Sequence, residues 1–276
     1  MAKIIDEYKQ LNYLKSERLN DNVIRSLLMY VNDIKISTDF TLSLENECKN
    51  IGKLHELVSK VLAGIPYQYA INSSTFLGND FYVDLRVLIP RNETEELTQN
   101  VIKLIDELNI KKGNVFDICS GSGVIAISIK KKYPDLNVFG SDISKDAIEV
   151  SEINNKRLNT NVEFRQGNLF EPFKDLKVDV LVSNPPYIGI DEEVDEMVLK
   201  HEPHLALFAN PRTKFYEEMF SQIQNNLNDI YLLAFEISPL LVEPLKDITK
   251  KYFKDTEIRF EKDMYNNYRY LYIIKR

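Results

Sequence analysis

Residues 115–132 read VFDICSGSGVIAISIKKK, and this stretch combines the signals of a strand, a tight turn and a helix. The apolar run Val115–Ile118 predicts a short strand, and a helix is expected over Val124–Lys132. Ser120-Gly121-Ser122-Gly123 forms the turn between them. Glycines at such a turn let a ligand approach the backbone, and the N-terminus of the following helix is partly positive. A pair of glycines is weak support for a cofactor site when it stands alone, so the rest of the chain is needed to interpret it.

Strands and helices alternate from this stretch to the end of the chain. Further strands are expected over residues 137–142, 162–164, 178–182, 230–237, 257–260 and 269–274, with helices over 145–157 and 240–251. The last two strands are joined by the short turn Tyr265–Tyr268, so they should be antiparallel to each other. The pattern predicts an α/β, Rossmann-like domain with a doubly wound, seven-stranded sheet that is mostly parallel and has one reversed strand.

The chain before this domain has a different character. Residues 1–72 carry apolar side chains at three- and four-residue steps, which predicts a small helical-bundle domain. Asp21 and Asn22 are candidates to cap one of its helices. Residues 73–90 predict a β-hairpin connector, and residues 91–276 form the α/β domain. We expect the helical N-terminal domain to recruit the substrate.

Asp142 ends the second strand of the α/β domain, about 20 residues after the glycine turn. An acid at this place accepts hydrogen bonds from ribose hydroxyls. Together, the glycine turn and Asp142 predict a cofactor that carries a nucleoside. The dinucleotide fingerprint has a third small residue after the turn, and Ala126 is tolerated there, so this motif alone does not exclude NAD.

Asn184-Pro185-Pro186-Tyr187 follows the fourth predicted strand, at the edge of the sheet where α/β proteins bind ligands. Each proline fixes a backbone φ angle, and Pro185 also holds Asn184 in an extended conformation. A carboxamide and a phenol ring on a stiff backbone suit the binding of a flat, amide-like group. The alternative is an ordinary turn at the end of a strand.

These motifs together resemble those of a known enzyme family. The stretch 117–123 resembles the glycine motif of S-adenosylmethionine-dependent methyltransferases, and residues 184–187 resemble the NPPY motif of the enzymes that methylate exocyclic or amide nitrogens. More narrowly, residues 66–69, 76–83, 88–95 and 202–207 resemble the signature of the release factor glutamine methyltransferases. The resemblance covers nearly the whole chain, and residues 88–95 are its most specific part.

The resemblance implies a reaction and a substrate. The methyl donor is S-adenosyl-L-methionine. The acceptor is the side-chain amide nitrogen (N5) of the glutamine in the Gly-Gly-Gln motif of peptide chain release factors. Methylation of this glutamine modulates translation termination. For this chemistry we predict that Asn184 Oδ1 and the carbonyl oxygen of Pro185 accept the two amide N–H groups, so that the nitrogen faces the methyl group. Tyr187 would pack flat on the amide plane.

The resemblance also assigns residues to the site. The substrate-binding and catalytic residues are Asn184, Pro185, Pro186 and Tyr187. The cofactor-binding residues are Asp117, Cys119, Ser120, Gly121, Ser122, Gly123, Asp142, Leu169 and Asn184, and residues that line the open side of the cofactor are Arg91, Thr94 and Glu95. Three of these have a second interpretation: Asp117 braces the glycine turn, Leu169 is core packing, and Thr94 caps a helix.

The chain departs from the family pattern at four positions. Cys119 stands where glycine is usual, Asn92 where proline is usual, and Asn168 where an acid is common. Ser238 stands where glycine normally follows the Glu236-Ile237 pair. None of these positions lies in residues 184–187, so the departures concern the affinity for the cofactor rather than the class of reaction.

Composition narrows the classes of function. The net charge of −7 argues against a broad nucleic-acid interface, and an acidic protein is suited to a basic protein partner. Three histidines and two distant cysteines form no metal-ligand motif, and no apolar run is long enough to span a bilayer. We therefore expect a reduced cytoplasmic protein, a monomer, without a metal, without direct binding to nucleic acid and without a membrane segment.

Two other functions remain open on the sequence. A nucleic-acid N6-adenine methyltransferase shares the NPPY motif, because an exocyclic amine is also flat, but it should carry a basic target-recognition region. A non-catalytic binding module could keep the fold without the activity. The complete motifs at residues 117–123, 142 and 184–187 favour an active enzyme.

Overall fold

The computed structural model describes residues 2–276, and the backbone contacts divide the chain into two compact units. The first unit is Met1–Ser73 together with Asp195–His201, and the second is Ser74–Val194 together with Glu202–Arg276. Two features of this division differ from the expected segments. The hairpin belongs to the second unit rather than standing between two domains, and Asp195–His201 belongs to the first unit.

The first unit is helical. Its helices are α1 (Ile4–Tyr13), α2 (Asp21–Val31), α3 (Ser37–Leu42), α4 (Ile51–Leu62), α5 (Tyr67–Ile71) and α9 (Glu196–His201). The apolar stripes of α2 and α4 face each other, and Leu27, Leu28, Leu54 and Leu57 are completely buried in the core between them. The helical period of the apolar side chains therefore predicted this core correctly.

The cap of α2 was predicted wrongly. Asn20, not Asp21 or Asn22, caps the helix: its side chain accepts a hydrogen bond from the Val23 backbone N–H at 3.2 Å. Asp21 instead accepts a hydrogen bond from the Tyr8 hydroxyl of α1 at 2.6 Å and pairs with Arg25. The carboxylate is thus engaged with a neighbouring helix, which the local sequence does not reveal.

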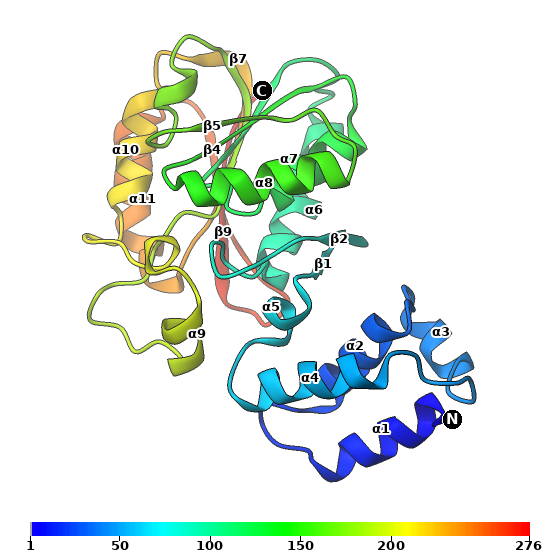
Figure 1. Ribbon diagram of the computed structural model, residues 1–276. Coiled ribbons are helices and arrows are strands. Elements are labelled where there is room, and N and C mark those ends of the chain that lie inside the picture. The colour runs from blue at the N-terminus through cyan, green and yellow to red at the C-terminus, as the bar shows by residue number, and fades with distance from the viewer. Residues whose placement is uncertain (1) are drawn as a thin grey trace. The chain divides into compact units, whose positions relative to one another are not determined.

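The second unit is built on a seven-stranded sheet within the described chain (Figure 1). Its strands are β3 (Asn114–Ile118), β4 (Asn137–Asp142), β5 (Glu163–Gln166), β6 (Val178–Ser183), β7 (Leu227–Glu236), β8 (Glu257–Lys262) and β9 (Tyr268–Lys275). They lie in the order β5-β4-β3-β6-β7-β9-β8, and β9 is antiparallel to both of its neighbours. The predicted mostly parallel sheet with one reversed strand is confirmed.

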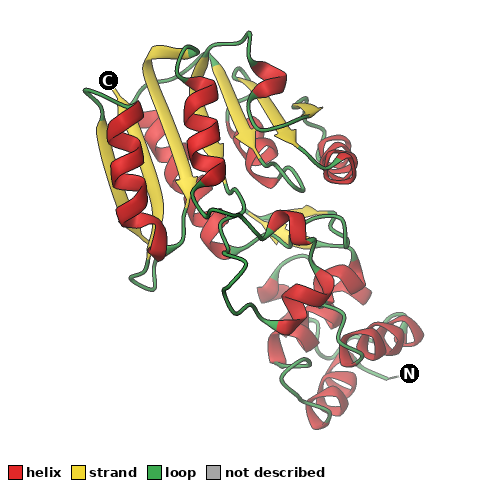
Figure 2. Cartoon of the chain, turned by 90° about the vertical axis from the view of Figure 1, so that its left-hand side faces the viewer, coloured by secondary structure: helices red, strands yellow, loops and turns green. Residues whose placement is uncertain are grey.

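Helices cover both faces of this sheet (Figures 1 and 2). One face packs against α6 (Asn92–Glu107), α7 (Val124–Lys132) and α8 (Lys145–Arg157), and also against the hairpin of β1 (Ser74–Phe76) and β2 (Asn79–Phe81). The other face packs against α10 (Lys214–Ile223) and α11 (Val242–Tyr252). The central strands β3 and β6 are therefore buried between two helical layers, whereas the edge strands β5 and β8 are partly exposed.

The alternation of side chains along β9 shows how one strand serves both cores. Tyr270, Tyr272 and Ile274 lie in the core beneath α6 and α7, whereas Leu271 and Ile273 lie in the core beneath α10 and α11. Successive side chains of a strand point to opposite faces, so a continuous apolar run is needed when both faces are covered.

Residues 2–276 contain no helix that is long and apolar enough to cross a membrane.

The order of the strands creates a switch point at β3 and β6. These two strands are neighbours, and the chain leaves β3 toward β4 and β5 but leaves β6 in the opposite direction, toward β7. The loops that follow β3 and β6 therefore diverge to opposite faces. In open α/β sheets this divergence leaves a crevice at the carboxyl ends of the strands, where ligands bind.

Candidate active site

A cavity of about 330 Å³ lies at this switch point, within the second unit. Its wall includes Cys119–Ser122 after β3, Ser141–Ser144 at the end of β4, and Asn184 after β6. The size is at the lower end of the range for small-molecule sites. The cavity thus joins the two motifs that the sequence placed on separate strands, the glycine turn and the NPPY segment.

The two glycines of the turn have different roles. Both have a positive φ angle, +51° at Gly121 and +78° at Gly123. A Cβ atom on Gly123 would lie 2.8 Å from the Phe164 ring and 3.0 Å from Ser151, so this glycine lets α7 pack closely. A Cβ atom on Gly121 would meet nothing within 4 Å, because this residue faces the cavity. Gly121 therefore leaves the backbone accessible to a ligand.

Cys119 adopts the left-handed conformation that glycine would adopt without strain. Its φ angle is +62°, and its side chain lies at the cavity wall. A non-glycine residue pays a conformational penalty of about 1 kcal/mol or more in this region. The departure from the family pattern thus keeps the shape of the turn while straining its backbone.

Asp142 ends β4 and lines the cavity, as predicted. Its Oδ2 accepts a hydrogen bond from the Gly121 N–H at 2.9 Å, and its Oδ1 accepts one from the Ser144 N–H at 2.9 Å. Burial raises the pKa of this carboxyl group, and the backbone donors partly offset that effect. Each oxygen of a carboxylate has two lone pairs, so both can still accept a hydroxyl from a ligand.

Asp117 lies outside the cavity wall. It is completely buried beneath the first turn of α7, where its Oδ2 accepts a hydrogen bond from the Ala126 N–H at 3.0 Å. Its Oδ1 has no partner within the described residues. Burial raises the pKa of Asp117 to about 8, and the nearby Asp142 adds to this effect. This geometry is that of a brace for the glycine turn and the start of α7.

Asn184 is held by a chain of hydrogen bonds that crosses the sheet. Its Nδ2 donates to Thr94 Oγ1 of α6 at 3.0 Å, and the Thr94 hydroxyl donates to Oε2 of Glu236 at 2.7 Å. Oε1 of Glu236 accepts a hydrogen bond from the Tyr187 hydroxyl at 3.0 Å. Burial raises the pKa of Glu236, whereas the two hydroxyls and the charge of Arg269 favour its ionised form.

The NPPY residues divide between the cavity and the core. Asn184 and Pro186 line the cavity, whereas Pro185 is buried outside its wall. The ring of Tyr187 packs against the core beneath α10, and burial raises the pKa of its hydroxyl far above the usual range. The predicted roles of the Pro185 carbonyl and of Tyr187 as a platform remain predictions.

An ion pair between the partly exposed Arg91 and the buried Glu202 lies at another part of the cavity wall. Arg91 Nη2 pairs with Oε1 of Glu202, and Oε2 of Glu202 accepts a hydrogen bond from the Ile89 N–H at 3.2 Å. The pair joins the segment before α6 to the segment Pro203–Ala206, and both contribute cavity residues. Of the other residues expected near the cofactor, Thr94 lines the cavity and Glu95 does not.

Most of the remaining predicted residues line the cavity, whereas Gly123 does not. Ser120 and Ser122 belong to the cavity wall, as do Asn168 and Leu169 after β5. Leu169 both lines the cavity and packs in the core beneath α10, so its position is compatible with a contact to the cofactor and with core packing. Within residues 2–276, no three His, Cys, Asp or Glu side chains gather in a way that could hold a metal ion.

Glu202 and Glu236 were not among the predicted site residues. Both are almost completely buried, with exposed fractions of 5% and 2%. Acids are seldom buried without a partner, so an acid at the end of an apolar strand, as Glu236 is, was the available signal. Two of their partners, Arg91 for Glu202 and Thr94 for Glu236, lie more than a hundred positions away in the sequence and could not be identified from it.

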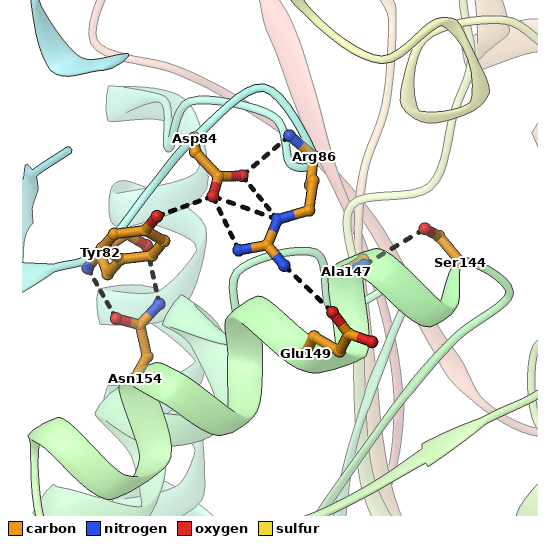
Figure 3. Close-up of polar contacts among 7 residues, drawn as sticks. All are labelled: Tyr82, Asp84, Arg86, Ser144, Ala147, Glu149 and Asn154. Carbon is orange, nitrogen blue, oxygen red and sulfur yellow. Dashed lines mark hydrogen bonds and ion pairs between the residues drawn. The ribbon is translucent and has the colours of Figure 1, made fainter. Parts of the chain in front are cut away.

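The segment after β2 is fastened to α8 by a polar network that Figure 3 shows. Asn154 is completely buried and binds the backbone of Tyr82 twice: its Oδ1 accepts from the N–H at 2.6 Å and its Nδ2 donates to the carbonyl at 2.9 Å. Nδ2 also donates to the carbonyl of Ser122 at 2.9 Å. Arg86, which lines the cavity, is held by Asp84 and Glu149.

We expect Asn154→Ala to lower the free energy of unfolding by about 2–4 kcal/mol, because it leaves buried backbone groups of Tyr82 and Ser122 without partners. Urea unfolding followed by circular dichroism measures the change. Glu149→Gln is the matched control in the same network: its ion pair is half-exposed, so its loss should cost less than about 1 kcal/mol. Equal stability of Asn154→Ala and the wild type would show that this contact is dispensable.

Comparisons with known proteins identify the family of the chain. Residues 93–205 match the family model of the methyltransferase small domain. The chain is 37% identical over 208 residues to a release factor glutamine methyltransferase of Bacillus subtilis, which covers 73% of this chain and 72% of that protein. It is 32% identical to a protein of the same name from Leptospira interrogans, over 100% of this chain and 97% of the relative.

A solved structure supports the fold. A methyltransferase from Pyrococcus furiosus superposes with a TM-score of 0.55 over 79% of this chain and 98% of its own, at 18% sequence identity. This likeness concerns the fold, whereas the family follows from the two sequence relatives, which are 37% and 32% identical over 73% and 100% of this chain. The chain therefore belongs to the release factor glutamine methyltransferase family.

Proposed function

We propose that this protein transfers a methyl group from S-adenosyl-L-methionine to the side-chain amide nitrogen of the glutamine in the Gly-Gly-Gln motif of peptide chain release factors. The observation that carries the proposal is the place of Asn184. It follows β6, next to the strand that leads into the glycine turn, and it lines the same cavity as that turn and the end of β4, with its amide nitrogen bound to Thr94. The names of the relatives, which are 32–37% identical, support the substrate.

The chain's residues fit the proposed methyl donor. Asp142 keeps free lone pairs toward the cavity for the two ribose hydroxyls, and Gly121 leaves the backbone open beside it. The apolar side chains of Ile143 and Leu169 border the same part of the wall, where they suit the faces of an adenine ring. When bound there, S-adenosylmethionine supplies a methyl group that its sulfonium has already activated.

The task of the NPPY segment is then to orient a poor nucleophile. The lone pair of an amide nitrogen is delocalised, so the nitrogen attacks only when its π lobe faces the methyl carbon. Asn184 Oδ1 and the carbonyl oxygen of Pro185 accept the two N–H groups of the substrate and hold that orientation. The same acceptors stabilise the positive charge that develops on the nitrogen. The stiffness of two consecutive prolines keeps both acceptors in place.

The proposal extends to the setting of the reaction. We propose that the enzyme acts as a monomer in the cytoplasm, with a protein substrate and without direct binding to nucleic acid. The net charge of −7 supports a protein partner, since a nucleic-acid interface needs a basic face. We assign recruitment of the substrate to the helical unit, which carries none of the residues of the cavity wall.

One experiment tests the function against its alternatives. The protein is incubated with methyl-labelled S-adenosylmethionine and either a purified release factor or double-stranded DNA. We expect the Gly-Gly-Gln peptide of the release factor to gain the mass of one methyl group, with fragmentation placing it on the glutamine side chain. Label in adenine of the DNA would indicate a nucleic-acid methyltransferase. Binding of the cofactor without transfer to either substrate would indicate a binding module.

A further inference from the structure

We propose that Thr94 and Glu236 are positioning residues that determine which atom of the Asn184 carboxamide faces the substrate. The inference rests on the proposed function, because it assigns the Oδ1 atom of Asn184 to the substrate amide. The side-chain amide of Asn184 can adopt two orientations that differ by a rotation of 180°, and they exchange a donor for an acceptor. Only the orientation that offers an acceptor can bind the N–H group of a glutamine amide.

The hydrogen-bond partners of Thr94 select between these orientations. The Thr94 hydroxyl carries one proton and lies 2.7 Å from Oε2 of Glu236 and 3.0 Å from Nδ2 of Asn184. A carboxylate accepts hydrogen bonds and does not donate them, so the hydroxyl proton is directed to Glu236. The oxygen of Thr94 then has lone pairs, and no proton, for Asn184. The NH₂ group of Asn184 satisfies it, and Oδ1 is left for a donor in the cavity.

The opposite orientation of Asn184 is disfavoured by the same atoms. A rotated amide would place Oδ1 against the Thr94 oxygen, so that two acceptors would meet without a proton between them. Thr94 is 5% exposed and Glu236 is 2% exposed, so little water can relieve that contact. An unsatisfied buried polar group costs about 1–3 kcal/mol, which is enough to hold one orientation in most molecules.

Glu236 also holds Tyr187, the last residue of the NPPY segment. Its Oε1 accepts a hydrogen bond from the Tyr187 hydroxyl at 3.0 Å, while Oε2 is bound to Thr94. The backbone carbonyl of Glu236 accepts a hydrogen bond from the buried Tyr216 hydroxyl at 2.7 Å, which secures the end of β7 beneath the site. One buried carboxylate thus aligns both ends of the NPPY segment, and its partners come from α6 and from the loop after β6.

The experiment replaces one hydroxyl at a time. Thr94→Val keeps the volume of the side chain and removes the oxygen, so we expect the kcat for methylation of a release factor to fall about 10- to 100-fold. The dissociation constant for S-adenosylmethionine should change by less than about threefold. Thr94→Ser restores the hydroxyl and should restore most of the activity. Thr98→Val is the matched control: Thr98 is buried one turn further along α6, and its hydroxyl binds the Thr94 carbonyl rather than Asn184.

Glu236→Gln tests the direction of the hydrogen bonds. The new amide can donate to Thr94, which would turn the Thr94 proton toward Asn184 and favour the orientation that hides Oδ1. We expect a loss of kcat at least as large as that of Thr94→Val, in a protein that still folds and binds the cofactor. Full activity of Thr94→Val or Glu236→Gln would overturn the proposal, as would a Thr94→Ser variant as slow as Thr94→Val.

A second measurement needs no substrate and separates this inference from the proposed function. NMR of the enzyme follows the exchange of the Asn184 side-chain amide protons with water. We expect one of the two protons to be protected in the wild type and in Thr98→Val, and to lose its protection in Thr94→Val. Equal exchange in all variants would contradict the positioning role. Absence of methylation by the wild type would contradict the proposed function. The NMR experiment would still test the orientation of the Asn184 side-chain amide, because it needs no substrate.

Discussion

Replacing Asn184 by alanine is expected to lower the rate of methyl transfer about 100- to 1000-fold at saturating cofactor. In the proposed mechanism, the loss follows from removing one of two acceptors that orient the substrate nitrogen and stabilise its developing charge. The remaining acceptor, the Pro185 carbonyl, allows the amide to rotate away from the line of attack. Single-turnover assays with a purified release factor measure the step directly, because they are not limited by release of the product.

The binding of the cofactor should survive this change. Asn184 contributes one side chain to the cavity wall, whereas the glycine turn and Asp142 contribute the backbone and the carboxylate. Titration calorimetry with S-adenosylmethionine should therefore give a similar affinity for Asn184→Ala and the wild type. Asn168→Ala is the matched control, since Asn168 lies in the same wall after β5 and should affect cofactor affinity more than kcat. Substantial methylation by Asn184→Ala would sink the proposed mechanism.

Asp117→Asn is expected to remove a pH dependence of stability that is worth several kcal/mol. In the folded protein, burial raises the pKa of Asp117 to about 8 from a usual value of 3.8. Between these two values the folded state retains a proton that the unfolded state has lost. The free energy of unfolding of the wild type should therefore fall by about 1.4 kcal/mol for each pH unit in this window as the pH rises, and level off above about 8.

The measurement compares unfolding in urea at several values between pH 5 and pH 9. Asparagine does not titrate, so the stability of the wild type relative to Asp117→Asn should decrease with rising pH up to about 8. The solvent-exposed Asp175 gives the matched control, and any slope shared by Asp175→Asn and Asp117→Asn comes from other groups. Parallel curves for the wild type and Asp117→Asn would show that the buried carboxyl group does not carry this proton.

The strands and helices could be read from the chain because their signals are local. A period of two or of three to four residues in the apolar side chains selects strand or helix, and the structure places α7 and α8 over the predicted residues. Strand ends were less certain: β7 begins at Leu227 rather than Ile230, since Leu227 pairs with Val178 of β6. Such pairing depends on a neighbouring strand that no local pattern contains.

Some residues of the site could also be predicted from local signals, whereas the contacts of others depend on distant parts of the chain. The glycine turn, Asp142 and Asn184 follow strands directly, so their meeting at one edge of the sheet follows from the parallel order of the strands. Thr94 had two interpretations on the sequence, a helix cap or a cavity residue. The structure shows its hydroxyl bound to Glu236 and Asn184, which lie on elements 142 and 90 positions away.

The sequence by itself determined the class of fold, the family and most of the predicted residues that line the cavity, because apolar periods and short motifs act over a few residues. Only the tertiary structure decided how those side chains are oriented. Asn184 can offer a donor or an acceptor, and the choice depends on a hydroxyl from α6 and a carboxylate from β7. The direction of the hydrogen bond between Asn184 and Thr94 depends on Glu236 as well, and these three residues come together only when the chain folds.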